Sequence, residues 1–159
     1  MLIYSAKEHE KFLREIVIEP PGKMLEAGFT YHAVILMAQS IEIFGAYFDN
    51  KPFRSIGQSL NRFALGIDNL FPYAYHRANA RNQLYKQLRA LFVHSFLPGT
   101  NLQIKEQGRT EEHLEQKNAT IIIIPAVLHN DVLHAGIKLI KKLNDNQINP
   151  KKVSTSLFS

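Results

Sequence analysis

Arg89 and His94 stand five positions apart in a stretch of strongly helical character, residues 84–98, and together they could act on a phosphate. A guanidinium holds phosphate oxygens through paired, charge-assisted hydrogen bonds. An imidazole can take up or release a proton near neutral pH, as general acid–base catalysis requires. A guanidinium and an imidazole are the minimal set of catalytic groups with which a protein can cleave RNA without a metal. Because the spacing also arises by chance, the surrounding helix has to carry the argument.

The helix that must position this pair has two different faces. Its core stripe consists of Leu84, Leu88, Leu91 and Phe92. Arg89 and His94 are about 140° apart on an α-helical wheel and bracket the opposite side, with Ala90 and Val93 between them. A small apolar strip of this kind suits close contact with another helix, so we expect a homodimer through it. The alternative is that His94 satisfies helix-end carbonyl groups and that Arg89 pairs with an acid such as Glu42.

Residues 84–98 resemble the motif of the HEPN (higher eukaryotes and prokaryotes nucleotide-binding) superfamily, with the sequence Leu-Tyr-Lys-Gln-Leu-Arg-Ala-Leu-Phe-Val-His-Ser-Phe-Leu-Pro. The family motif is an arginine followed after four to six residues by a histidine on a helix. These two residues map onto Arg89 and His94. The resemblance implies an all-α bundle, often homodimeric, and in many members a metal-independent endoribonuclease of toxin–antitoxin or phage-defence systems. It also implies that Arg89 stabilises charge on the phosphate and His94 transfers a proton, with Glu42 as a candidate orienting partner.

Basic residues recur along the same predicted helix. Arg77 and Arg81 are four positions apart and precede Lys86, with Tyr85 beside it. Because arginines hold phosphates and tyrosines stack on bases, Arg77, Arg81, Lys86 and Tyr85 are candidate contacts to single-stranded RNA. The alternative is an ordinary solvated basic face. The chain has 19 Lys and Arg against 14 Asp and Glu, and this net charge of +5 favours an anionic partner.

No metal and no cofactor are predicted. The chain has no cysteine, which excludes disulfides, thiolate ligands and a cysteine nucleophile. His129, Asp131 and His134 lie close together, but zinc-binding histidine pairs use spacings of three or four and these two histidines are five apart. The chain also has no glycine-rich phosphate loop, dinucleotide fingerprint or serine nucleophile elbow.

Hydrophobic periodicity predicts a mainly α-helical bundle, HEPN-like in its layout, with a small antiparallel β insertion at about residues 101–124. Helices are expected over residues 5–18, 29–49, 55–70, 73–96 and 125–143, and strands over 101–107, 111–116 and 119–124, with none elsewhere. The helix over 29–49 is apolar nearly all round and should be central. The residues Pro20-Pro21-Gly22 should separate the first helix from the body. Residues 1–146 are interpreted as one domain and 147–159 as a flexible tail.

The chain has the size and composition of a soluble domain. Its 159 residues, 45% of them hydrophobic, are enough to bury one core. Its start lacks a signal-peptide pattern, and the longest apolar stretch, 34–48, contains polar residues that prevent it from spanning a bilayer. We therefore expect a cytoplasmic protein without a membrane partner.

The expected function is RNA binding, with or without metal-independent cleavage, in a homodimer. A cognate antitoxin or another protein is a candidate partner. Two alternatives stay open: a non-catalytic helical dimerisation or interaction module, and a small-ligand or nucleotide-binding domain without turnover. The surroundings of Arg89 and His94 should distinguish them.

Overall fold

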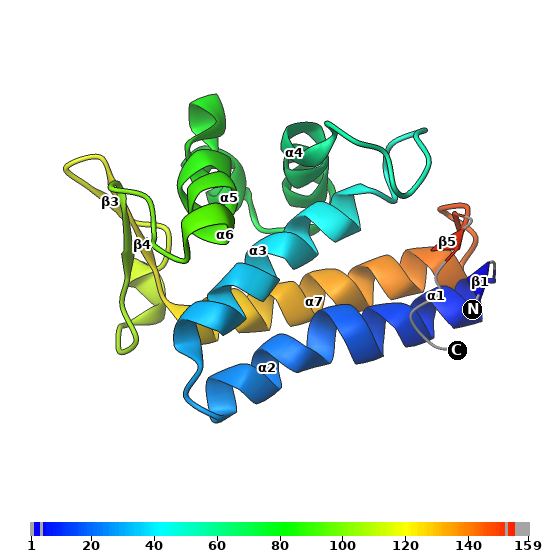
Figure 1. Cartoon of the computed structure of the whole chain (residues 1–159), viewed down its shortest axis with the longest axis horizontal. Helices are drawn as coiled ribbons and strands as arrows, with labels where there is room; N and C mark the ends of the chain where they lie inside the picture. Colours follow the sequence, from blue (N-terminus) through cyan, green and yellow to red (C-terminus); the bar gives the residue numbers. More distant parts are fainter. Residues whose placement is uncertain (1, 4, 152, 155–159) are drawn as a thin grey trace.

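The computed structural model describes residues 2–3, 5–151 and 153–154, and it is mainly helical with a small three-stranded sheet (Figure 1). The predicted fold class, mainly α with a small β insertion, is confirmed. The helices are α1 (Ala6–Phe12), η1 (Leu13–Ile18), α2 (Glu19–Glu26), α3 (Thr30–Gly45), α4 (Ser59–Leu70), α5 (Tyr73–Ala78), η2 (Ala80–Asn82), η3 (Tyr85–Leu91), α6 (Phe92–Ser95), η4 (Thr110–Glu112) and α7 (Pro125–Asn144). Of these, η1 and η3 are π-helices, and η2 and η4 are 3₁₀ turns.

Residues 6–26 form one continuous helix that passes through α1, η1 and α2. It begins with a capping box, in which the Glu8 N–H donates to Ser5 Oγ and the Ser5 N–H donates to the Glu8 carboxylate. The prediction that Pro20-Pro21-Gly22 interrupts the helix was wrong. Both prolines lie in the first turn of α2, after a π-helix, where a missing backbone N–H is tolerated.

The β insertion is a mixed sheet rather than the predicted antiparallel one. Its strands are β2 (Leu102–Ile104), β3 (Gln116–Lys117) and β4 (Thr120–Ile123). β2 runs parallel to β4, whereas β3 and β4 form an antiparallel hairpin. After β2 the chain passes through η4 and β3. The turn between β3 and β4 then reverses its direction, so β4 runs parallel to β2. The strand expected over 111–116 is largely the end of η4 and an irregular segment.

A second, two-stranded sheet joins the two ends of the chain. β1 (Leu2–Ile3) pairs antiparallel with β5 (Val153–Ser154). The prediction of strands only between residues 101 and 124 was therefore wrong, because strands of two residues carry no readable alternation. Within the predicted tail, Lys151 accepts a hydrogen bond from His9 Nε2 at its carbonyl oxygen, at 2.6 Å. Residues 152 and 155–159 of that tail lie outside the described residues.

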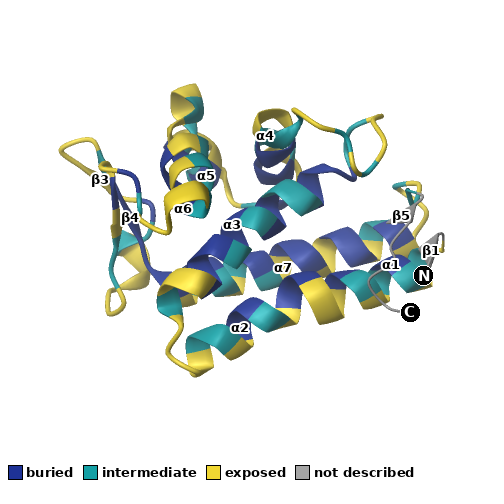
Figure 2. Ribbon diagram, viewed as in Figure 1, coloured by how far each residue is buried: buried dark blue, intermediate teal, exposed yellow. Residues whose placement is uncertain are grey.

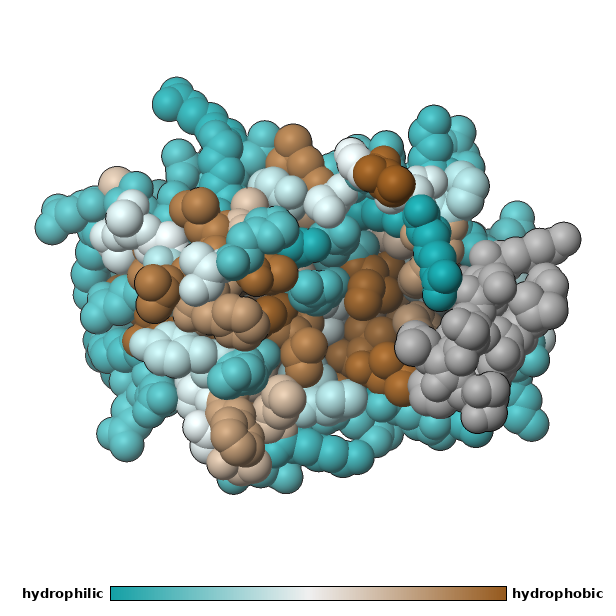
Figure 3. All heavy atoms as spheres, viewed as in Figure 1, coloured by the Kyte–Doolittle hydropathy of each residue, from teal (hydrophilic) through white to brown (hydrophobic). Residues whose placement is uncertain are grey.

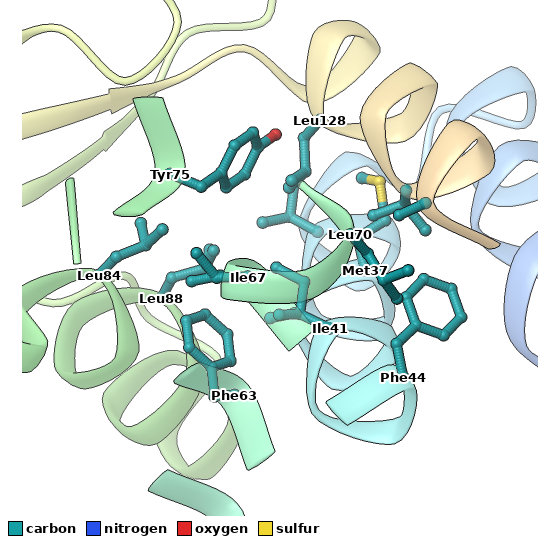
Figure 4. Close-up of a cluster of buried hydrophobic side chains, with 14 of the residues drawn as sticks. Met37, Ile41, Phe44, Phe63, Ile67, Leu70, Tyr75, Leu84, Leu88 and Leu128 are labelled. Atoms are coloured by element: carbon teal, nitrogen blue, oxygen red, sulfur yellow. The ribbon is translucent and has the colours of Figure 1, made fainter. Parts of the chain in front are cut away.

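α3 is the central helix, as predicted. It contacts α2, α4, α7 and both π-helices, and it is largely buried (Figure 2). Its side chains Met37, Ile41 and Phe44 meet buried side chains from α4, α5 and α7 (Figure 4). None of the helices within the described ranges has both the length and the apolarity to cross a lipid bilayer.

α3 and α4 cross with their backbones in contact. A methyl group added at Gly66 would overlap the carbonyl oxygen of Ile41, and one at Gly45 would overlap that of Arg62 even more closely. Both approaches are far closer than van der Waals contact. Glycine is therefore required at both positions for the helices to approach this closely.

A buried ionic cluster closes the loop between α3 and α4. Arg62 donates from Nε to Asp49 Oδ2 at 2.6 Å and from its Nη groups to the carbonyl oxygens of Pro52 and Phe53. Lys151 Nζ donates to Asp49 Oδ1 at 2.5 Å. Burial raises the pKa of Asp49, but hydrogen bonds from these two cations outweigh it and hold the pKa below its usual value.

Candidate functional site

The motif helix, residues 83–95, carries both Arg89 and His94 and is partly π-helical. Its π-helix, η3, ends at Leu91 and continues directly into α6. In a π turn the backbone hydrogen bond joins residues i and i+5. The angle between these two residues around the helix axis is therefore smaller than in an α-helix. Because this register covers Arg89, it reduces the angle of about 140° expected between Arg89 and His94. π turns are rare and are often found at functional sites.

Arg89 is anchored to the central helix through one edge of its guanidinium. Its Nε donates to Glu42 Oε2 at 2.6 Å, and Glu42 Oε1 accepts a hydrogen bond from Ser59 Oγ at 2.8 Å. The pairing of Glu42 with Arg89 suggested by the sequence is therefore present. The chain Ser59–Glu42–Arg89 connects α4, α3 and the motif helix and fixes the orientation of the guanidinium.

The other edge of the Arg89 guanidinium is open. Its two Nη groups make no hydrogen bond to any described residue. In the part of the chain that the structure describes, no buried side-chain nitrogen or oxygen lacks a hydrogen-bond partner. The Nη groups must therefore reach solvent, although the side chain as a whole is only 13% exposed. An arginine held by Nε with free Nη groups is suited to bind a pair of phosphate oxygens.

His94 is exposed near the end of the motif helix and makes no hydrogen bond to a described residue. The alternative prediction, that it satisfies helix-end carbonyl groups, was wrong. Ser95 Oγ takes that place, at 2.7 Å from the carbonyl oxygen of Leu91 and 3.0 Å from that of Leu97. The helix then ends at Phe96, which is left-handed with φ 56°. The imidazole of His94 is thus accessible to a ligand.

The predicted RNA contacts fall into two groups. Arg77, Arg81 and Lys86 are exposed, and the Arg77 guanidinium lies 6.0 Å from the ring centroid of exposed Tyr73. Tyr85 instead is half-buried and packs edge to face on a buried phenylalanine of α4. The three cations are accessible to a ligand, whereas Tyr85 serves the packing of the core.

Apolar side chains gather on the surface beside the motif helix. We define the aromatic patch as Phe29, Tyr31, His32, Phe96 and Leu97, all exposed. The His32 ring lies 6.0 Å from the rings of both Phe29 and Phe96, which joins the start of α3 to the end of the motif helix. Apolar side chains gather in the middle of the face shown in Figure 3. The sequence had placed Phe29 inside a buried helix, so it did not predict this patch.

The sequence also missed a hydrogen-bonded chain of Tyr75, His113 and Asp131. The Ile124 N–H donates to His113 Nδ1 at 3.0 Å, so the neutral ring carries its proton on Nε2. Nε2 donates to the Tyr75 hydroxyl at 2.9 Å, which donates to Asp131 Oδ2 at 2.8 Å. These residues come from α5, the β insertion and α7, and no local pattern links them. These hydrogen bonds hold the β insertion against the helical bundle.

Burial shifts the pKa values in this chain. It lowers the pKa of His113 to about 4 and raises that of Asp131, although the hydrogen bond from Tyr75 partly opposes the second shift. The pKa of Tyr75 is raised by burial and by the adjacent Asp131 carboxylate. His113 therefore stays neutral at pH 7 and keeps its donor role toward Tyr75.

We expect the protein to lose stability as the pH falls from about 6.5 to about 4. Over this range the unfolded chain protonates His113 and the folded protein does not, so proton uptake favours unfolding. The share of His113 should be about 1–2 kcal/mol after allowance for its partial exposure. Replacing His113→Gln, which can keep both hydrogen bonds, should flatten this part of the profile. Urea unfolding of both proteins at several pH values measures the difference.

The unfolding free energy at pH 7 is the control for this comparison, because it shows whether glutamine keeps the two hydrogen bonds. His9 also has a pKa lowered by burial, and it adds to the acid loss equally in both proteins. A His113→Gln variant with the same acid loss as the parent would contradict the assignment.

No family model, curated protein sequence or solved structure significantly matches this chain. Among the described residues, no group of three or more His, Asp and Glu side chains is placed to hold a metal ion. The function is therefore inferred from the site itself.

Proposed function

We propose that the protein binds RNA as a HEPN-like homodimer and cleaves it without a metal, through Arg89 and His94. One observation supports this proposal: Arg89 is fixed by Glu42 at Nε, its Nη groups make no hydrogen bond to a described residue, and the His94 imidazole on the same helix is exposed. A buried, fully satisfied arginine and a histidine bonded to its own helix end would have no such use. Glu42 acts as a positioning residue, because it orients the guanidinium rather than touching RNA.

The reaction fits the two open groups. A 2′-hydroxyl of the RNA attacks the adjacent phosphorus, the bond to the 5′-oxygen breaks, and the products are a 2′,3′-cyclic phosphate and a 5′-hydroxyl. His94 removes the 2′-hydroxyl proton as a base or donates a proton to the leaving oxygen as an acid. Arg89 stabilises the charge that develops on the non-bridging phosphate oxygens.

Two proton transfers and one motif histidine per chain favour a homodimer, in which each copy supplies one His94. The motif helix offers a surface for this contact, on which Ala90 and Val93 are half-buried. Leu91, which the sequence placed in the core stripe, is instead 48% exposed and adds to this surface. The aromatic patch extends this apolar surface. Sedimentation of the protein at micromolar concentration should show a dimer.

The nuclease proposal predicts cleavage of single-stranded RNA in EDTA. His94→Ala should abolish the reaction, and Arg89→Ala should lower its rate by about 10²–10³, as loss of a charge-stabilising donor does. Product ends identified by mass spectrometry should carry the cyclic phosphate. Circular dichroism checks that both variants fold.

Lys138→Ala and His134→Ala are matched controls, because both residues are exposed on α7 and outside the motif helix. Each should cleave at the rate of the parent. RNA left intact by the unaltered protein at high concentration, or cleaved equally by His94→Ala, would overturn the proposal.

The aromatic patch favours a second candidate function, a non-catalytic interaction module. A protein such as a cognate antitoxin could cover the patch, and Arg89 would then only order the interface. A dimer, or a complex with such a protein, that shows no cleavage would favour this candidate.

A further inference from the structure

We propose that a groove between α5 and the β insertion binds an extended segment of single-stranded RNA. This rests on the proposed function and adds to it a path for the substrate outside the Arg89–His94 pair. We call this feature the α5 groove. In Figure 1 the sheet lies beside α5, and the two elements form the walls of the groove.

The α5 groove consists of two adjoining pockets. The first has a volume of about 330 Å³ and is lined by Arg77 from α5 and Leu114 from the insertion. The second has a volume of about 260 Å³ and is lined by Arg81 from η2 and by Asn101 next to β2. Gln116 on β3 lines both pockets, so the two pockets adjoin at this residue.

The chemistry of the walls matches a nucleotide chain. Arg77 and Arg81 are exposed, and neither is engaged in an ion pair with a described residue, so both can bind phosphates. The side-chain amides of Gln83, Asn101 and Gln116 make no hydrogen bond to the described protein. Free amides offer a donor and an acceptor side by side, which is what the edge of an unpaired base requires.

The remaining wall residues complete a surface suited to bases. Ala74, Ala80 and Ala119 supply the accessible apolar area of the walls. Leu114, Ala78 and Ile121 are buried beneath it. Glu115 is the carboxylate in the first pocket, and it pairs with Lys117 at 3.2 Å, so its charge is compensated. The groove therefore carries a net positive charge. This charge favours a polyanion over a positively charged partner.

Backbone strain is concentrated at the second pocket. Arg81 and Ala119 line it from opposite walls, and both are left-handed, with φ 55° and φ 66°. This conformation is costly for residues other than glycine and asparagine and persists where the surroundings impose it, often at binding sites. The turn after α5 and the β3–β4 turn therefore both contribute a left-handed residue to the lining of this pocket.

Binding of short fluorescein-labelled single-stranded RNA, followed by anisotropy, tests the groove. All measurements use a His94→Ala background so that the RNA stays intact. Arg77→Ala and Arg81→Ala should each weaken binding about tenfold or more. Each should also lower the slope of log affinity against log salt by about 0.7. Gln116→Ala should change the preference among homopolymers, because it removes an amide shared by both pockets.

Arg54→Ala is the matched control, an exposed arginine in the loop before α4 and outside the groove, and it should bind as the background does. Equal binding by the Arg77→Ala, Arg81→Ala double variant and the background overturns the proposal. So does the absence of any RNA binding. A mononucleotide that binds as tightly as the oligonucleotide also overturns it, because the groove would then hold a free nucleotide and not a strand.

The outcome is separable from that of the nuclease proposal. If the protein with His94 intact cleaves RNA and the groove variants bind it normally, only the groove is overturned. If the groove variants lose binding while the intact protein leaves RNA uncut, the groove stands and the nuclease proposal falls.

Discussion

Replacing Asp49→Asn should lower the free energy of unfolding by about 3–5 kcal/mol, because it leaves Arg62 buried without a counter-charge. Both side chains are only 6% exposed, and Lys151 shares the same carboxylate at 15% exposure. Asparagine keeps the shape and one acceptor, so the loss reports the charge rather than a cavity. Guanidinium chloride unfolding at pH 7 measures it.

Asp68→Asn is the control for this substitution. Asp68 pairs with His76 at 2.7 Å, but both side chains are about half exposed. Pairs of this kind contribute at most about 1 kcal/mol. Equal losses in the two variants would show that burial of the Asp49 cluster adds nothing to its strength.

Replacing Gly66→Ala should destabilise the protein by about 3 kcal/mol, at the upper end of what overpacking costs. The added methyl group would overlap the Ile41 carbonyl oxygen, which belongs to the backbone of the central helix. No rotamer change can relieve it, so α3 and α4 must separate. The better helix propensity of alanine, about 1 kcal/mol, offsets only part of the loss.

Asn61→Ala on the same helix is the matched control. Asn61 is exposed and makes no hydrogen bond to a described residue, so alanine there should be neutral or slightly stabilising. Urea unfolding of both variants gives the comparison. A Gly66→Ala variant as stable as the parent would mean that the two helices can part at no cost.

Sequence patterns predicted the central helix and two of the strands, but not how the strands are arranged. The 29–49 helix is apolar nearly all round, and α3 is central for that reason. Alternation predicted β2 and a β-branched run predicted β4, but neither pattern gives the relative direction of the two strands, which the intervening chain decides. Pro20 and Pro21 were interpreted as a break because the rule that proline ends helices does not foresee a π-helix just before them.

The candidate site also has features that the sequence predicted and features that depend on the tertiary structure. The Arg89 and His94 positions were visible in the sequence, and Glu42 was predicted as a partner of Arg89, a pairing that the structure contains. The open Nη groups of Arg89 depend on burial, which sequence does not report. Tyr75 and His113 meet across 38 positions of the chain, and only the tertiary fold brings them together.

The pairing of β1 with β5 has a practical consequence for engineering. Leu2 lies opposite Ser154, at the pole of the molecule away from the three-stranded sheet (Figure 1). Because positions 2 and 154 are neighbours, residues 2–154 are suited to circular permutation, in which a short linker joins these two positions and new termini are opened elsewhere. The exposed segment 106–109 between β2 and η4 is a place for such an opening. In the permuted chain β2 would lie at the new C-terminus and β3 and β4 near the new N-terminus, so the parallel pairing of β2 with β4 would form without the segment that now connects them.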